Sequence, residues 1–203
     1  GAVSVNYFSN AVHLTTKGVD LILTYQTTVN EGEFAITFAG NINDTEIDRV
    51  NTREGIPASV TLDKNNRDFI TDSQPSERAT LSFDYDKGPW STLIRANYFG
   101  ETEVSLFGAN HINLPGTLSP TGAFKPTSVV EAATLIDVNV DYQVSSAFTI
   151  SMGVNNLFDV TPDELGDDEV LQFISQQAFR YPLRAVPYGF DGMSYYARVG
   201  FVF

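Results

Sequence analysis

Apolar and polar residues alternate with a period of two along most of this chain. The last ten residues show it clearly, because Tyr195, Val199, Phe201 and Phe203 share one side and the residues between them share the other. A period of two is the repeat of a β-strand, whose successive side chains point to opposite faces. No stretch shows a convincing helical period. The alternation predicts about eight strands, at Val3–Phe8, Gly18–Val29, Glu33–Ile42, Arg78–Tyr85, Trp90–Gly100, Thr134–Val144, Ala147–Phe158 and Ser194–Phe203.

Short and long connections take turns between the predicted strands. The tight turns are Asn30–Gly32, Asp86–Pro89 and Ser145–Ser146. The long polar connections cover about 43–77, 101–133 and 159–193. Loops of that length are unusual in a compact domain, whereas transmembrane β-barrels combine short turns on one side with long loops on the other. The spacing therefore predicts an all-β, antiparallel, up-and-down transmembrane β-barrel, with long external loops and with every tight turn on the side where Phe203 ends.

The two faces of the predicted strands differ in polarity. In the second segment, Val19, Leu21 and Leu23 share one face, whereas Asp20 and Thr24 share the other. A soluble β-sandwich with one wet face is the alternative to a membrane wall. Aromatic residues on the apolar face gather near the tight turns, at Tyr25, Phe34, Tyr85, Trp90, Tyr142, Phe148 and Phe203. Such a row is typical of an interfacial aromatic girdle and favours the membrane.

Composition removes several classes of function. The 203 residues include 12 Lys plus Arg against 25 Asp plus Glu, for a formal net charge of −13. This balance argues against nucleic acid as a partner. The absence of cysteine removes disulfide frameworks, thiolate metal sites and cysteine nucleophiles. No apolar run reaches the roughly 18–20 residues of a transmembrane helix. No export signal is visible in Gly1–Asn6, so we expect either a removed signal or a fragment.

Four motifs occur in a fixed order along the chain. Thr16–Leu21 reads TKGVDL, Ile136–Tyr142 reads IDVNVDY, Asn155–Asp159 reads NNLFD, and Pro187–Gly192 precedes the final strand. Together they resemble the C-terminal β-barrel portion of TonB-dependent outer-membrane receptors. The resemblance implies that residues 1–203 form about the last eight strands of a barrel of about 22 strands. No segment of this chain resembles the family's N-terminal plug domain or its TonB box.

The resemblance also implies a function and partners. It implies a receptor in the outer membrane of a Gram-negative bacterium, which takes up a scarce, bulky nutrient such as an iron–siderophore, a cobalamin-like compound or an oligosaccharide. The expected partners are the TonB complex, acting through the plug, the barrel-assembly machinery and outer-membrane lipid. The family's terminal strand is an assembly signal, which falls here on Tyr195, Val199, Phe201 and Phe203. The family motif falls on Asn156, Leu157, Phe158 and Asp159, for which we expect structural roles.

Residues for catalysis are scarce. The chain has no Gly-x-Ser-x-Gly elbow, no His-Glu-x-x-His motif and no phosphate-binding glycine loop. We therefore expect no enzyme, no cofactor and no metal site, and we expect ligand contacts at His111, Phe107, Phe124 and Tyr181 in the external loops. Two alternatives stay open. An outer-membrane barrel enzyme would depend on His13 or His111, and a passive porin would conduct without an energy source.

Overall fold

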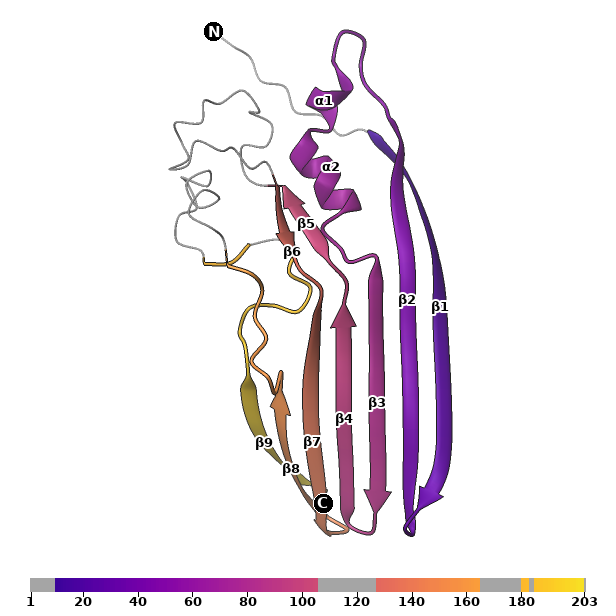
Figure 1. Ribbon diagram of the computed structural model, residues 1–203, viewed down its shortest axis with the longest axis vertical. Helices are drawn as coiled ribbons and strands as arrows, with labels where there is room; N and C mark the ends of the chain where they lie inside the picture. Colours follow the sequence, from indigo (N-terminus) through magenta and orange to yellow (C-terminus); the bar gives the residue numbers. More distant parts are fainter. Residues whose placement is uncertain (1–9, 106–126, 165–179, 183–184, 203) are drawn as a thin grey trace.

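The computed structural model describes residues 10–105, 127–164, 180–182 and 185–202. The elements within these ranges are mostly strands. They are β1 (Val12–Val29), β2 (Gly32–Val50), α1 (Ala58–Thr61), α2 (Lys64–Thr71), β3 (Glu77–Lys87), β4 (Trp90–Phe99), β5 (Thr102–Ser105), β6 (Thr127–Val130), β7 (Ala133–Ser145), β8 (Phe148–Asn155) and β9 (Ser194–Phe201). Seven of the strands form one sheet in the order β1-β2-β3-β4-β7-β8-β9, and β5 pairs with β6 in a separate hairpin (Figure 1).

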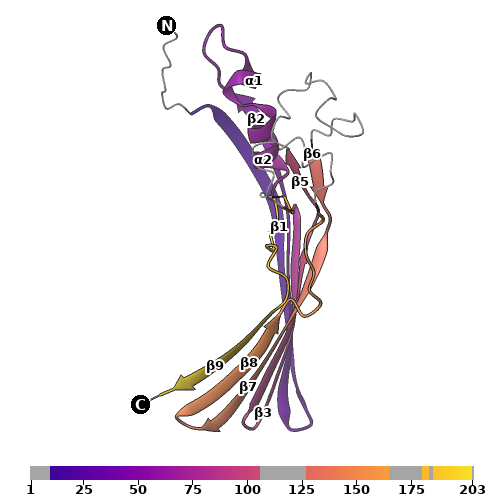
Figure 2. The same cartoon turned by 90° about the vertical axis from the view of Figure 1, so that its left-hand side faces the viewer.

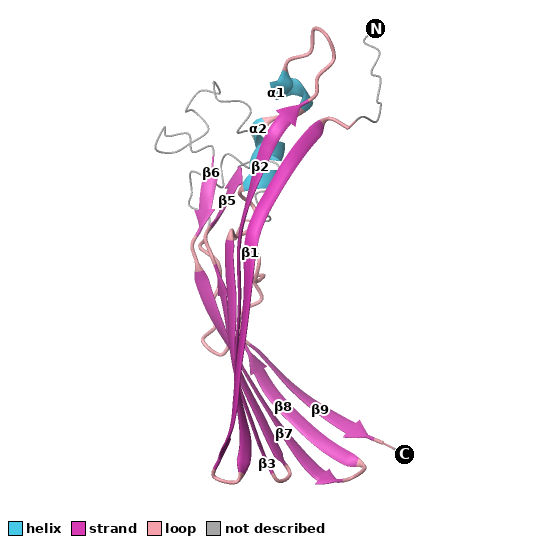
Figure 3. Ribbon diagram, turned by 90° about the vertical axis from the view of Figure 1, so that its right-hand side faces the viewer, coloured by secondary structure: helices cyan, strands magenta, loops and turns pink. Residues whose placement is uncertain are grey.

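Every pair of neighbouring strands in the sheet is antiparallel, as predicted. The tight turns lie together at one end, which we call the turn end, and both helices lie at the opposite end, which we call the loop end (Figure 3). The sheet twists strongly, so that β7, β8 and β9 splay apart from β1 at the turn end (Figure 2). Among the described strands the sheet is open, with β1 and β9 as its edges.

The first tight turn shows how local chemistry ends a strand. Val29 pairs with Gly32, and the two residues between them, Asn30 and Glu31, have φ values of 49° and 66°. A two-residue hairpin turn of this kind matches the twist of the strands but needs positive φ at both central positions. Asn adopts that conformation readily, whereas Glu does so at some cost in strain. The turn sets the register of β1 against β2.

The long connection predicted at 43–77 is only partly a loop. β2 continues to Val50, and the helices α1 and α2 lie between it and β3. The strand was missed because both faces become polar after Ile42, so alternation stops although main-chain pairing continues. The helix α2 was missed because it is short. Its start is set by the Asp63 side chain, which accepts a hydrogen bond from the Asn66 amide at 2.8 Å.

Other boundaries differ from the predicted ranges by smaller amounts. β1 begins at Val12 rather than Gly18, and β8 ends at Asn155 because Asn156 has a φ of 53° and leaves the extended conformation. β3, β4 and β7 start and stop within two residues of their predicted bounds. The hairpin β5–β6 lies in the predicted loop 101–133, where four-residue strands are too short to show a period. The segment 3–8 and Phe203 lie outside the described residues.

Neither face of the sheet is covered within the described residues. The apolar side chains of β1 stay accessible, with Val19 at 70% and Tyr25 at 62% exposure. Three hydrophobic residues of the described ranges are buried, namely Leu62, Val130 and Ala185. All three lie in the connections rather than in the seven-stranded sheet. The packed core of this chain is therefore at the loop end, and the sheet is a two-sided wall.

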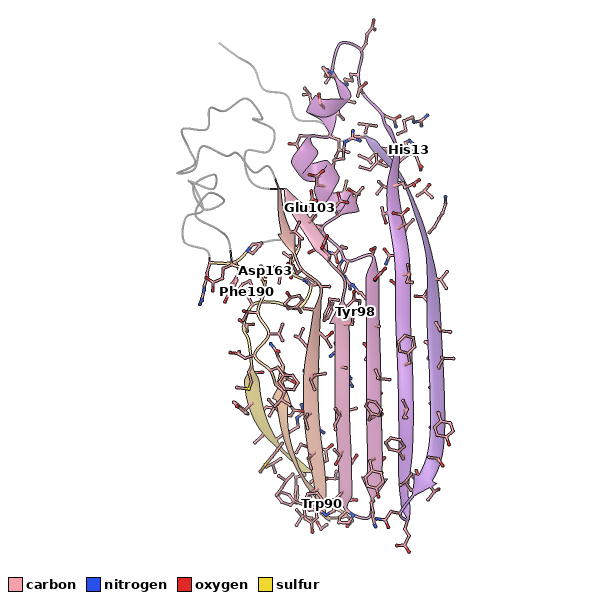
Figure 4. The ribbon with its side chains drawn as sticks, viewed as in Figure 1. His13, Trp90, Tyr98, Glu103, Asp163 and Phe190 are labelled. Carbon is pink, nitrogen blue, oxygen red and sulfur yellow. The ribbon has the colours of Figure 1, made fainter. Side chains whose placement is uncertain are left out.

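The aromatic row predicted at the turn end is visible in the pairing of the strands. Phe34 lies opposite Tyr85, with ring centroids 6.5 Å apart, and Trp90 lies opposite Tyr142, with centroids 4.5 Å apart. Trp90 marks this end of the sheet in Figure 4. Gly32 makes room for the row, because a Cβ there would lie 2.7 Å from the Tyr85 ring. Neighbouring strands thus carry their rings at one level.

Candidate functional site

The family motif Asn156–Asp159 forms a turn that is held by hydrogen bonds of Asn156. Its side chain donates to the carbonyl of Val160 at 2.7 Å and accepts from the Val160 amide at 2.9 Å, and the residue is 5% exposed. The Asp159 amide donates to the Asn156 carbonyl at 2.9 Å, which closes a turn over Asn156–Asp159. Both ends of the turn have positive φ, 53° at Asn156 and 54° at Asp159. Asn and Asp are the non-glycine residues that adopt this conformation most readily.

Asp159 joins this turn to a distant part of the chain. Its Oδ1 accepts a hydrogen bond from the amide of Met193 at 2.8 Å, across 34 positions of sequence. Gly192 is required beside this contact, because a Cβ there would lie 2.4 Å from Asp159 Oδ1 and because its φ is 69°. Met193 directly precedes β9. We call this contact the Asp159 clamp, since it fixes where the terminal strand begins.

Asp137 anchors the same turn to the sheet. The Asn156 amide donates to Asp137 Oδ1 at 2.9 Å, and Asn97 Nδ2 donates to Asp137 Oδ2 at 2.9 Å. The Leu157 amide also donates to the Ile136 carbonyl at 2.7 Å. A carboxylate on the polar face of β7 therefore holds the turn that follows β8 and a side chain of β4.

The terminal strand has a second specific contact on the polar face. Tyr196 pairs with Gly153, and a Cβ on Gly153 would lie 2.4 Å from the Tyr196 ring. The ring thus occupies space that the glycine leaves free. The Tyr196 hydroxyl donates to Asn139 Oδ1 at 2.7 Å, two strands away. Tyr196 therefore fits one position along β8 by shape and by a hydrogen bond.

Buried residues at the loop end join several of the long connections between strands. Val130 is 1% exposed, and the Thr102 hydroxyl donates to the Ala185 carbonyl at 2.5 Å. The Glu103 amide donates to the carbonyl of Asp72, just after α2, at 3.0 Å. Figure 4 places Glu103 above the sheet, on the hairpin β5–β6. The connections therefore pack on one another into a small cap above the wall.

Aromatic side chains line this cap. Tyr188 packs on Phe99, with ring centroids 5.7 Å apart, and Tyr181 stacks on Phe190 at 6.2 Å. Burial, together with the nearby Asp163 carboxylate, raises the pKa of Tyr188 above its usual value. Phe190 is 50% exposed. The cap thus presents an accessible aromatic ring.

Arg180 adds an ion pair to this aromatic surface. Its guanidinium lies 5.5 Å from the centre of the Tyr181 ring, and it donates a hydrogen bond to Glu164. That hydrogen bond lowers the pKa of Glu164. Both side chains are exposed, so the pair contributes little to stability. It orients the guanidinium over the ring.

His13, a residue on which an enzymatic alternative depends, lies near the loop end of β1 (Figure 4). Its Nε2 is 3.0 Å from Arg49 Nη2 and 3.0 Å from Asn51 Nδ2. A guanidinium can only donate, so Nε2 is the unprotonated acceptor of the ring. This nitrogen holds a cation in place, which is a structural role. No group of three or more His, Cys, Asp and Glu in the described ranges is arranged to hold a metal ion.

The predicted site residues are partly visible. The family motif, Tyr195, Val199, Phe201 and Tyr181 lie in described ranges, whereas Phe107, His111, Phe124 and Phe203 lie outside them. The structure brings Asn156 and Asp159 together with Asp137, Gly192 and Met193. Sequence reasoning missed the links to Asp137 and Met193. Each joins positions that are far apart in the chain, and neither carries a local pattern.

Comparison with known families decides the identity of this wall. A family model described as "TonB dependent receptor-like, beta-barrel" matches residues 1–157. The chain belongs to the TonB-dependent receptor β-barrel family. This match confirms the family resemblance, and it includes the motifs at Thr16–Leu21 and Ile136–Tyr142. Apart from the separate hairpin β5–β6, the strands β1 to β9 follow one another in the sheet in chain order. No described helix is long and apolar enough to span a bilayer.

Two solved structures resemble this TonB-dependent receptor barrel in their fold. The copper transporter OprC has a TM-score of 0.52 at 16% sequence identity, and the match covers 95% of this chain and 24% of OprC. A chain in the structure of the FpvAI–pyocin S2 complex has a TM-score of 0.48 at 16% identity, covering 74% of this chain and 16% of that one. No curated protein matches the chain. The chain thus spans less than a quarter of the length of either structure.

Proposed function

We propose that this chain forms C-terminal wall strands of an outer-membrane receptor in a Gram-negative bacterium, which imports a scarce, bulky nutrient with energy from the TonB complex. The observation that carries the proposal is a sheet with one apolar and one polar face in a chain of the TonB-dependent receptor family. The apolar face would meet outer-membrane lipid. The polar face would meet the lumen and the plug domain.

The length of the apolar face along the strands supports contact of this face with lipid. On β1 it runs over the range Val19–Val29, which matches the roughly 9–11 residues that a tilted strand needs to cross the hydrocarbon layer. The aromatic row closes it at the turn end. Beyond Ile42, Asp44 and Glu46 follow on the same side of β2, with Lys17 of β1 opposite Asp44, so the face becomes charged. This change of polarity is where we place the outer surface of the bilayer.

The polar face supports a lumen assignment. Its side chains form hydrogen bonds between strands, as between Asn41 Nδ2 and Asp20 Oδ1 at 2.7 Å. Asp20 and Arg198 lie on this side, opposite Asn41 and Ser151 respectively. Such a surface suits water or a polar protein partner. It is costly against hydrocarbon, where a charged residue at the midplane is strongly destabilising.

The cap at the loop end would face the medium and contribute to ligand binding. Tyr181 and Phe190 offer an aromatic surface with Arg180 beside it. His111, Phe107 and Phe124 stay proposed contacts in the same external loops. Aromatic rings and a guanidinium suit bulky ligands such as an iron–siderophore, a cobalamin-like compound or an oligosaccharide. The terminal strand, including Phe203, would pair with the barrel-assembly machinery during insertion.

Growth of a deletion strain tests the proposal. The strain lacking the full-length receptor is supplied with single iron–siderophore, cobalamin or oligosaccharide sources at limiting concentration. We expect one source to support growth only when the full-length receptor is restored and TonB is intact. Matched strains lacking TonB provide the control for energy coupling.

The alternatives give different outcomes. A passive porin would restore growth without TonB and would conduct ions as the purified receptor in a planar bilayer. A barrel enzyme would lose a hydrolytic activity on substitution of His13 and His111. Either result would replace the transport proposal.

A further inference from the structure

The register of β9 against β8 is not explained by the connection between them. β8 ends at Asn155 and β9 begins at Ser194. A short hairpin turn fixes the register of its strands, but an excursion of this length does not. The alternation of faces forbids a slip of one residue, because it would turn Arg198 to the apolar side. A slip of two residues keeps every side chain on its face, so another contact must exclude it.

We propose that Asp159 and Tyr196 are positioning residues that set the register of the terminal strand. Asp159 acts at the start of β9, and Tyr196 acts within the strand on its polar face. The Asp159 clamp holds the residue before β9, and the Tyr196 ring fits over Gly153. Each contact is compatible with one alignment of β9 on β8.

The clamp excludes slippage because it holds the backbone itself. Asp159 is held in a turn that Asn156 closes and that Asp137 ties to the sheet. Its carboxylate therefore lies at a fixed height above β8. A slip of two residues would move the Met193 amide about 7 Å along the strand, well beyond hydrogen-bond reach.

Tyr196 excludes slippage by shape. In the observed register its ring lies over Gly153, where no side chain competes for the space. After a slip of two residues the ring would lie opposite Ser151 or Asn155, and both carry side chains on the polar face. Its hydroxyl would also lose Asn139.

The register of this strand matters for the whole receptor. The far edge of β9 has no partner among the described residues, and in a closed barrel it pairs with another strand. Closure requires a fixed stagger around the barrel, so an error of two residues at β8–β9 would be carried to that last seam. The two contacts let β9 present its free edge at the correct height.

Cysteine cross-linking in the full-length receptor, with any upstream cysteine replaced by serine, tests the proposal. This chain contains no cysteine, so introduced pairs are the only ones in it. Ser151→Cys with Arg198→Cys reports the native register, because these residues are directly opposed. Ser151→Cys with Gly200→Cys, and Thr149→Cys with Arg198→Cys, report slips of two residues in the two directions. Each pair is oxidised, and mass spectrometry of its peptides gives the yield of disulfide. The yield of a slip-reporting pair divided by that of the native pair is the ratio of slipped to native disulfide.

We expect this ratio to rise about fivefold in Asp159→Ala and again in Tyr196→Ala, as for the loss of one hydrogen bond each. Gly192→Ala should act like Asp159→Ala, because its Cβ would displace the carboxylate. Asp159→Asn keeps the acceptor and should leave the ratio unchanged. Tyr25→Ala, which removes an exposed tyrosine from β1 and leaves β8 and β9 untouched, is the matched control for Tyr196→Ala.

Native cross-links alone in Asp159→Ala, Tyr196→Ala and the double variant would overturn the proposal. An equal effect of Asp159→Asn and Asp159→Ala would overturn the role of the acceptor. A variant that does not accumulate in cells is refolded from urea into detergent and cross-linked there, which gives the same ratio. The assay measures strand pairing and not uptake, so its failure leaves the transport proposal standing.

Discussion

At the residue scale, the motif residues act through partners that are distant in sequence. The side chain of Asn156 forms its hydrogen bonds nearby, with the backbone of Val160, whereas its backbone amide donates to the carboxylate of the distant Asp137. Asp159 reaches Met193 across 34 positions. Each residue combines a backbone conformation that few residue types adopt with a hydrogen bond that needs an oxygen. Both requirements together explain why Asn and Asp stand at these two positions.

Tyr188 leads to a prediction about pH. Burial, and secondarily Asp163, raises its pKa, so the folded receptor favours the neutral phenol. The contribution of neutral Tyr188 to the stability of the fold is complete below the pKa of about 10 that tyrosine has in the unfolded chain. It is lost as the pH rises through the higher pKa of Tyr188 in the folded receptor. Tyrosinate absorbance of the full-length receptor, minus that of Tyr188→Phe, should show a midpoint above about 10. Asp163→Asn should lower the midpoint only slightly, because Asp163 is the smaller of the two causes of the raised pKa. A midpoint at or below the ordinary pKa of tyrosine would contradict the packing of Tyr188 on Phe99.

At the element scale, β2 contains two regions of different character. Up to Ile42 one of its sides is apolar, and beyond that residue the same side carries Asp44 and Glu46. Main-chain pairing with β1 runs through both regions to Val50. A hydrogen-bonded ladder needs no particular side chains, so the strand outlasts its hydrophobic pattern. The helix α2 and the hairpin β5–β6 likewise form in two segments, 43–77 and 101–133, whose sequences predict polar loops.

The assignment of faces leads to a prediction about substituted strands. Leu81 lies in the middle of the apolar face of β3, and Thr80 is its neighbour on the polar face. Leu81→Arg should destabilise the receptor in lipid vesicles by about 2–4 kcal/mol, because it places a cation at the midplane. Ala79→Arg, nearer the loop end, should cost less. Thr80→Arg is the matched control, and equilibrium unfolding in guanidinium is the measurement. Equal costs at Leu81 and Thr80 would contradict the lipid face.

At the scale of the whole molecule, this chain is an open wall with a packed cap. Its buried hydrophobic residues within the described ranges lie in the connections, whereas apolar residues such as Val199 (64% exposed) and Phe201 (64% exposed) stay accessible. Within the described ranges the sheet has two unpaired edges, β1 and β9. Lipid on one face, a plug on the other and further strands at both edges would complete it.

The isolated chain should therefore behave poorly in water. Without detergent, we expect residues 1–203 to aggregate or to pair edge to edge, because exposed apolar strands and free ladder groups associate readily. Light scattering and sedimentation of the refolded chain measure its state, and addition of detergent should reduce the association. The full-length receptor in detergent is the control. A soluble, stable monomer of the isolated chain would contradict the assignment of lipid to the apolar face.

Local pattern in the sequence is enough to predict the class of fold, the positions of most wall strands and the family. These features follow from local pattern, since alternation, turn residues and motifs are all read over a few neighbouring positions. Phe34, Tyr85 and Trp90 could be placed at one level for that reason. The family motif was found as well, although its partners were not.

The alignment of the terminal strand and the place where the chain packs depend on contacts that form only in the folded protein. The contacts of Asp159 with Met193 and of Tyr196 with Asn139 join residues that no periodic pattern connects. The hydrogen bond from the Thr102 hydroxyl to the Ala185 carbonyl also joins two separate connections. Such contacts depend on which distant segments come together in space. Side-chain alternation fixes the face of a residue but not its height along the neighbouring strand, and that height is set by these few contacts.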